Sequence, residues 1–291
     1  RDRKGRAIST STGVRQLATP GDTVVLTLDR GIQRAAEEAL DQIVESSEPE
    51  SASAIVMDVE TGAVLAMANR PTTNPNDPMR QSAAFRNHAV ADAHEPGSVL
   101  KPFIVAMALE DGEYRAGTSV DCENGFWRVG RIPIRDDHPH RTVSVEEVIK
   151  YSSNIGTAKM ALHLGADRVI EGLKEFGFAS RTGVGLPGEA SGFLRKPEAI
   201  KRIELATTAY GQGMTATGIQ LASALAALGN GGERMQPWIV SEIRDRVGEV
   251  QMRNRPRSLG QVVSEDTAGV VVDMMESVLE EGGTGTLAKV P

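Results

Sequence analysis

The sequence is poor in cysteine, lacks long apolar runs and carries no excess of basic charge. Cys122 is the only cysteine in 291 residues, which excludes an internal disulfide and a cysteine metal cluster but does not settle the compartment. No apolar run approaches the ~20 residues that a membrane-spanning helix needs. The net charge of -7 and the pI of about 5.4 argue against nucleic-acid binding through a basic surface. The hydrophobic content of 40% and the charged content of 24% are typical of soluble globular proteins.

The beginning of the chain shows no targeting segment. Arg1-Asp2-Arg3-Lys4-Gly5 is polar and lacks the apolar core of a signal peptide, and a start without Met suggests a trimmed or partial chain. We predict that residues 1–20 are a linker or the remnant of an upstream region, and that residues 21–291 form the main domain.

The pattern of apolar residues and turn signals predicts strands first and helices in the middle. This order favours an α+β fold, or a helical insert in a sheet domain. The expected strands cover residues 23–28, 53–59 and 63–68. One helix is expected directly after Asp29, and others at residues 99–108, 144–164, 167–176, 217–228 and after Ser264. Residues 69–78, 117–143 and 183–192 are predicted to be irregular, and residues 244–257 to be charged and exposed.

The stretch around Ser98 and Lys101 is the strongest candidate for a catalytic site. Pro96-Gly97 predicts a turn, and an apolar helical run from Val99 follows it. Residues three apart share a helix face, so the hydroxyl and the amine can meet. Burial lowers the pKa of a lysine, which makes it a possible base for a serine nucleophile. Ser-x-x-Lys alone is common, however, and most instances are a helix N-cap followed by a solvated lysine.

A second polar motif lies some fifty residues further on. Ser144-Val145-Glu146-Glu147 is a capping box that begins a helix, and this helix is interrupted at Ser152-Ser153-Asn154. A serine hydroxyl and an asparagine amide exposed at such a break can relay a proton and bind a substrate amide. Alone, Ser-x-Asn is more often just a polar break in a helix.

The histidines give little support for a metal site. Asp136-Asp137-His138-Pro139-His140 could be taken for one, but Pro139 interrupts it and no helical spacing of histidines supports it, so we predict a solvated loop. His88 and His94 are isolated and are predicted to be structural. We expect no metal and no cofactor.

Ser98-x-x-Lys101 followed by Ser152-x-Asn154 is the motif pair of penicillin-binding proteins and class A β-lactamases. The chain resembles the transpeptidase domain of class B penicillin-binding proteins, which are D,D-transpeptidases of bacterial cell-wall synthesis. The resemblance starts near residue 20 and covers the rest of the chain. Further similar segments are Gly21-Asp22 through Gln33, Leu186-Pro187-Gly188-Glu189, Tyr210-Gly211-Gln212-Gly213 and Leu228-Gly229-Asn230-Gly231-Gly232. The segment before residue 20 resembles the end of an upstream pedestal domain.

The resemblance implies a role for each motif residue. Lys101 would take the proton of Ser98, and Ser98 would form an acyl-enzyme with a stem peptide ending in D-Ala-D-Ala. Ser152 would help to pass a proton to the leaving amine, and Asn154 would hold the peptide amide. β-Lactams would acylate Ser98 and stay bound. The family also implies a membrane anchor upstream, a periplasmic location, and other cell-wall synthesis proteins such as a glycosyltransferase as partners.

One family motif, Lys-Thr-Gly, does not occur in this sequence. Gly283-Thr284-Gly285-Thr286 resembles the glycine-rich turn that precedes this motif in the family, and the chain stops at Pro291. We therefore expect a domain truncated before its Lys-Thr-Gly strand, with an open sheet edge and one oxyanion-hole donor missing. Loss of such a donor costs about 10²–10³ in rate, so the truncated chain is expected to be impaired or inactive.

Two alternative functions remain open at this point. A β-lactamase shares both motifs but releases the acyl group to water, although no dedicated deacylating glutamate is evident. A non-catalytic scaffold or sensor of the same fold is supported only by the absent Lys-Thr-Gly.

Overall fold

The structure is a computed structural model that describes residues 21–74 and 86–288. Helices and antiparallel strand pairs alternate along it, which confirms the predicted α+β class. Within these residues, no helix is long and apolar enough to cross a membrane. The described residues divide into two compact units: one consists of residues 21–26 and 240–254, and the other of residues 27–74, 86–239 and 255–288.

The first unit is a three-stranded antiparallel sheet. Strand β11 (Val240–Arg244) lies between β1 (Thr23–Leu26) and β12 (Val250–Arg253). The Glu242 carboxylate contacts two guanidinium groups, Arg244 at 2.6 Å and Arg253 at 2.7 Å. The strand predicted at residues 23–28 is present as β1, and β12 is exposed, as predicted for residues 244–257. The prediction missed that these residues form a strand, because alternation of charged and apolar residues on an open hairpin resembles a loop.

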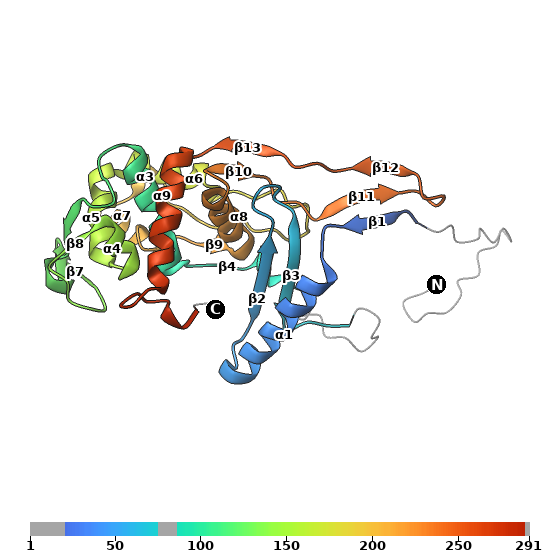
Figure 1. The fold of residues 1–291 in the computed structure, drawn as a ribbon, viewed down its shortest axis with the longest axis horizontal. Helices are drawn as coiled ribbons and strands as arrows, with labels where there is room; N and C mark the ends of the chain where they lie inside the picture. Colours follow the sequence, from blue (N-terminus) through green and yellow to red (C-terminus); the bar gives the residue numbers. More distant parts are fainter. Residues whose placement is uncertain (1–20, 75–85, 289–291) are drawn as a thin grey trace. The chain divides into compact units, whose positions relative to one another are not determined.

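In the second unit, helix α1 packs on a β-hairpin (Figure 1). The Asp29 side chain caps α1 (Arg30–Ser47) by accepting hydrogen bonds from two backbone N–H groups. The hairpin pairs β2 (Ala52–Met57) with β3 (Val64–Arg70), as predicted. On the predicted apolar face of α1, Ala36 and Leu40 are buried and Ile43 is 53% exposed. The last turns of the helix therefore extend beyond the hairpin.

A buried helix, α3 (Lys101–Glu110), forms the centre of the second unit. All residues from Lys101 to Ala108 are buried, and α3 packs against α5 (Asn154–Leu164), α6 (Ala166–Glu175) and α9 (Glu265–Glu276). The Phe103 ring lies 4.9 Å from the Phe176 ring, and burying one such side chain contributes ~1.5–3 kcal/mol. The first residue of α3 is thus held on a rigid element.

Residues 117–143, which we predicted to be irregular, form two small strand pairs. Strand β5 (Ser119–Asp121) pairs with β8 (Thr142–Ser144), and β6 (Phe126–Val129) pairs with β7 (Ile132–Arg135). Strands of three or four residues are too short for a clear alternation of apolar and polar side chains. This prediction was wrong for that reason.

The remaining elements complete the second unit. They are α2 (His88–Ala91), β4 (Ala93–His94) paired with β9 (Ala216–Thr217), the 3₁₀ turn η2 (Gly97–Leu100), α4 (Val145–Lys150), α7 (Arg202–Thr208), α8 (Gly218–Gly229), β10 (Glu233–Met235) paired with β13 (Ser258–Gln261), and the short 3₁₀ turns η3 (Glu123–Gly125), η4 (Pro197–Ala199), η5 (Ser277–Leu279) and η6 (Thr286–Ala288). The structure tests only part of the loop that we predicted at residues 69–78. Asn69 and Arg70 belong to β3, residues 71–74 form no helix or strand, and residues 75–78 lie outside the described residues.

Candidate active site

Ser98 lies in the 3₁₀ turn η2, directly before α3. The tight turn is made possible by Gly97, whose φ of +62° is a conformation that side-chain-bearing residues avoid. Ser98 is exposed, whereas Leu100 is fully buried and anchors the turn. Val99, which we expected to be buried, is 44% exposed, because the chain enters α3 through a 3₁₀ turn that changes the direction of this side chain.

Lys101 is buried, with 2% of its surface exposed, and its amine joins the two serine motifs. The Lys101 Nζ lies 3.0 Å from Ser98 Oγ and 2.7 Å from Ser152 Oγ, and it also contacts the Ser152 carbonyl oxygen. Burial lowers the pKa of Lys101 from 10.5 to about 8, and the nearby charges of Asp136 and Asp137 partly oppose this effect. A substantial fraction of the amine is therefore neutral in mildly alkaline solution and can accept a proton.

Ser152 lies at the break between α4 and α5, where the sequence predicted it. Its φ of +55° is in the left-handed region, which is unusual for a residue other than glycine. Helix α4 begins with the predicted capping box at Ser144 and Glu147, and Ser153 caps α5 by accepting from the Gly156 N–H. The left-handed residue between the two helices directs both the hydroxyl and the carbonyl of Ser152 to Lys101.

Asn154 is the first residue of α5 and follows Ser152 on the same turn. Its Nδ2 donates a hydrogen bond of 2.8 Å to the carbonyl oxygen of Arg135, at the end of β7. This contact fixes the Asn154 amide against the end of β7. The structure thus brings Ser98 and Ser152 into contact with Lys101 and places Asn154 two residues after Ser152.

Comparison with known proteins supports the same domain. The family model "Penicillin binding protein transpeptidase domain" matches residues 52–291. The chain belongs to this family.

Two relatives of this chain are both described as peptidoglycan D,D-transpeptidases. It is 35% identical to "Probable peptidoglycan D,D-transpeptidase PenA" of Neisseria meningitidis, over all of the chain and 48% of that protein. It is 32% identical to "Peptidoglycan D,D-transpeptidase FtsI" of Escherichia coli K12, over all of the chain and 47% of that protein. The chain therefore spans slightly less than half the length of these relatives.

Solved structures confirm the fold of the transpeptidase domain. The apo transpeptidase domain of Burkholderia pseudomallei penicillin-binding protein 3 superposes with a TM-score of 0.80 at 34% identity, over 91% of this chain and 73% of that one. A crystal structure described as a peptidoglycan glycosyltransferase from Burkholderia ambifaria also superposes with a TM-score of 0.80. Its sequence identity is 35%, over 92% of this chain and 78% of that one.

A glycine-rich segment contacts the turn that contains Ser98. The Gly97 N–H donates to the Gly211 carbonyl at 3.2 Å, and Glu95 Oε1 accepts from the Gly213 N–H at 2.8 Å. A Cβ on Gly211 would lie 2.2 Å from the Gly97 carbonyl oxygen. The sequence marked Tyr210-Gly211-Gln212-Gly213 as family-like, but only the fold shows that it contacts the Ser98 turn.

Replacement of Gly211 by alanine is expected to destabilise this turn. Gly211 and Gly213 both have positive φ values, +79° and +76°, so each Ala substitution introduces ~1–2 kcal/mol of backbone strain. Only Gly211→Ala adds a backbone clash, whereas the nearest atom to a Cβ on Gly213 lies 3.9 Å away. We predict a clearly larger fall in melting temperature for Gly211→Ala than for Gly213→Ala, measured by thermal unfolding. Equal falls would contradict the close approach of Gly211 and Gly97.

The predicted solvated loop at residues 136–140 is only partly solvated. Asp136 is half-buried and accepts hydrogen bonds from the turn that contains Ser152, whereas Asp137 and His138 are exposed. The sequence could not show this, because the partner residues lie 17 and 19 positions away. Among the described residues, no group of three or more His, Cys, Asp or Glu side chains could hold a metal ion.

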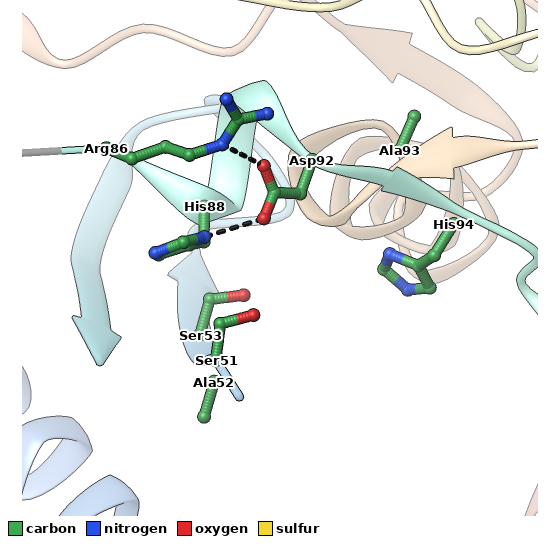
Figure 2. A pocket seen from close by; sticks show the side chains of 8 residues that line it. All are labelled: Ser51, Ala52, Ser53, Arg86, His88, Asp92, Ala93 and His94. Atoms are coloured by element: carbon green, nitrogen blue, oxygen red, sulfur yellow. Dashed lines mark hydrogen bonds and ion pairs between the residues drawn. The ribbon is translucent and has the colours of Figure 1, made fainter. Parts of the chain in front are cut away.

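An open pocket of about 790 Å³ lies between β2 and β4, and none of its lining residues belongs to the serine–lysine group (Figure 2). Its polar wall consists of side chains that bind one another. The Asp92 carboxylate contacts Arg86 and lies 2.6 Å from His88 Nδ1. His88 thus has a structural contact, consistent with our expectation.

Proposed function

We propose that this chain is the acyl-transfer domain of a peptidoglycan D,D-transpeptidase, which cross-links stem peptides through an acyl-enzyme on Ser98. The observation that supports this most directly is the position of the Lys101 amine, within hydrogen-bond distance of both Ser98 Oγ and Ser152 Oγ. An amine of lowered pKa beside a serine hydroxyl is an arrangement that activates a nucleophile without histidine.

The proposed reaction has two steps. Neutral Lys101 takes the proton of Ser98 as Ser98 Oγ attacks the carbonyl carbon between the two D-alanines. The new C–O bond forms, the C–N bond breaks, and the leaving D-alanine amine receives a proton by way of Ser152. The amino group of a neighbouring stem peptide then attacks the ester, which forms the cross-link and returns the proton to Ser98. Asn154 would hold the peptide amide throughout.

The family suggests the setting of this reaction. We propose that the domain acts outside the cytoplasm, on the outer face of the bacterial inner membrane, in a protein with a membrane anchor upstream. Cell division or cell shape would be the process served, together with other wall-synthesis proteins such as a glycosyltransferase. The similarity to "Peptidoglycan D,D-transpeptidase FtsI" supports a place in cell-wall synthesis, and the finer assignments follow from the resemblance to the family.

Acyl-enzyme lifetime tests the proposed function against the β-lactamase alternative. A penicillin that acylates Ser98 should remain attached to a transpeptidase and be released rapidly by a hydrolase. The measurement is the covalent adduct over time by intact-protein mass spectrometry, beside the release of hydrolysed drug. Rapid multiple turnover would contradict the proposal.

The rate of acylation should depend on pH through Lys101. Only the neutral amine of Lys101 can act as a base. Because burial lowers the pKa of Lys101 to about 8, the neutral fraction falls about tenfold for each pH unit below this value. We predict a rate constant for penicillin acylation that rises about tenfold per pH unit below pH 8 and levels off above it. A rate that is flat between pH 6 and 9 would contradict a role for Lys101 as the base.

A further inference from the structure

The end of β7 and the first residue after it hold the turn between α4 and α5 at three consecutive positions. Asp136 Oδ2 accepts a hydrogen bond of 2.7 Å from Ser153 Oγ, and Asp136 Oδ1 accepts one of 3.0 Å from the Ile155 N–H. The preceding residue, Arg135, is the last of β7, and its carbonyl oxygen accepts a hydrogen bond of 2.8 Å from Asn154 Nδ2. Two adjacent residues therefore fix the residues that directly follow Ser152.

Ser152 requires such support because its backbone is in the left-handed region, at a φ of +55°. This conformation costs a residue with a side chain ~1–2 kcal/mol and persists only where neighbouring contacts determine it. Ser152 uses it to direct two oxygens to Lys101 Nζ. Release of the following residues would allow Ser152 to relax and these contacts to open.

We propose that Asp136 is a positioning residue for acyl transfer: by binding Ser153 and Ile155, its carboxylate holds Ser152 in the conformation that presents its carbonyl and hydroxyl oxygens to Lys101. The inference rests on the proposed function. Asp136 does not contact the nucleophile and acts through Ser152 and Lys101.

The same carboxylate also acts on Lys101 through its charge. The charged groups that act on Lys101 are Asp136 and, to a smaller extent, Asp137, and both raise the pKa of the amine against the larger effect of burial. Asp137 is exposed and, within the part of the chain that the structure describes, accepts no hydrogen bond from the α4–α5 turn. It has the same charge without the positioning contacts, which makes it a matched control.

Three variants separate these effects: Asp136→Ala, Asp136→Asn and Asp137→Asn. For each, the rate constant of penicillin acylation is measured from pH 6 to 10, and thermal unfolding is followed in parallel. For Asp136→Ala we expect a plateau rate lower by about 10²-fold, because misplacement of catalytic groups by ~1 Å has an effect of this size. Asp136→Asn retains an acceptor for the Ile155 N–H, so its plateau should stay within about tenfold of the wild type.

The pH midpoint reports the charge. Removal of a negative charge lowers the pKa of Lys101, so both Asp136 variants should reach their plateau at a pH lower by about half a unit to one unit. Asp137→Asn should show a smaller shift in the same direction and a plateau within about twofold of the wild type.

Each outcome decides the inference. A plateau for Asp136→Ala equal to that of Asp137→Asn would overturn it, as would a loss of thermal stability with wild-type plateau and midpoint. If Asp136→Ala does not fold, Asp136→Asn decides: a plateau lower than that of Asp137→Asn supports the inference, and a plateau equal to that of Asp137→Asn overturns it. If the wild-type protein forms no adduct at all, the proposed function fails and the inference falls with it; if it acylates normally, only the inference is at stake.

Discussion

Replacement of Ser98 by alanine is expected to abolish covalent labelling by penicillin. The hydroxyl is the only atom of residue 98 that can form the ester, and it is exposed at the start of a buried helix with the Lys101 amine 3.0 Å away. The fold should be unaffected, because Ser98 makes no core contact and the Leu100 anchor of the turn remains. Labelling with a fluorescent penicillin, followed on a denaturing gel, measures the effect.

A second exposed serine provides the control for this variant. Ser191 lies in the loop between α6 and η4, and within the described residues its hydroxyl contacts only the neighbouring Gly192 carbonyl, at 3.3 Å. Ser191→Ala should label at the wild-type rate. Persistent labelling of Ser98→Ala at a level comparable to this control would show that another residue is the nucleophile.

Replacement of Lys101 by methionine is expected to slow acylation by about 10³-fold or more while the protein remains folded. General base catalysis contributes ~10²–10⁴ to a rate, and the variant also loses the contact that orients Ser98. Methionine is of similar length and suits a buried site, so the packing around α3 should persist. Lys174→Met, on the exposed face of α6, is the control. An unchanged rate for Lys101→Met would remove Lys101 as the base.

The pH dependence of the unfolding free energy tests whether the pKa of Lys101 is lowered in the folded protein. The pKa of Lys101 is about 8 in the folded protein and 10.5 ordinarily, so the unfolded chain binds more protons between these values. The free energy of unfolding of the wild type should therefore rise with pH from 8 to 10.5, by ~3 kcal/mol relative to Lys101→Met. Urea unfolding of both proteins at several pH values measures this difference. A constant difference across this range would show that the lysine is not held by burial at a lowered pKa.

The sequence was sufficient for the parts of the site that depend on local spacing. Ser98 and Lys101 are three residues apart at the start of an apolar run, and that spacing alone placed a hydroxyl beside a buried amine. The capping box at Ser144 and the break at Ser152 were local signals too, and both are present in the structure. The helices after Asp29 and Ser264 followed from caps and apolar periodicity in the same way.

The parts that depend on distant contacts could not be predicted. Asp136 was assigned to a solvated loop because its partners, Ser153 and Ile155, become neighbours only after the β6–β7 hairpin folds back on α5. The close approach of Gly211 to Gly97 spans more than a hundred residues. The left-handed backbone of Ser152 had no signal in the sequence, because serine there replaces the glycine or asparagine that usually marks this conformation.

Identification of the acylated residue shows directly whether Ser98 is the nucleophile. A folded protein containing this chain would be incubated with a penicillin at about pH 8.5, and its intact mass would be measured by mass spectrometry. Digestion into peptides would then locate the adduct. If Ser98 is the nucleophile, the mass increases by one whole drug molecule, on the peptide that contains Ser98. An adduct on a different residue, or no adduct on the folded protein, would contradict it.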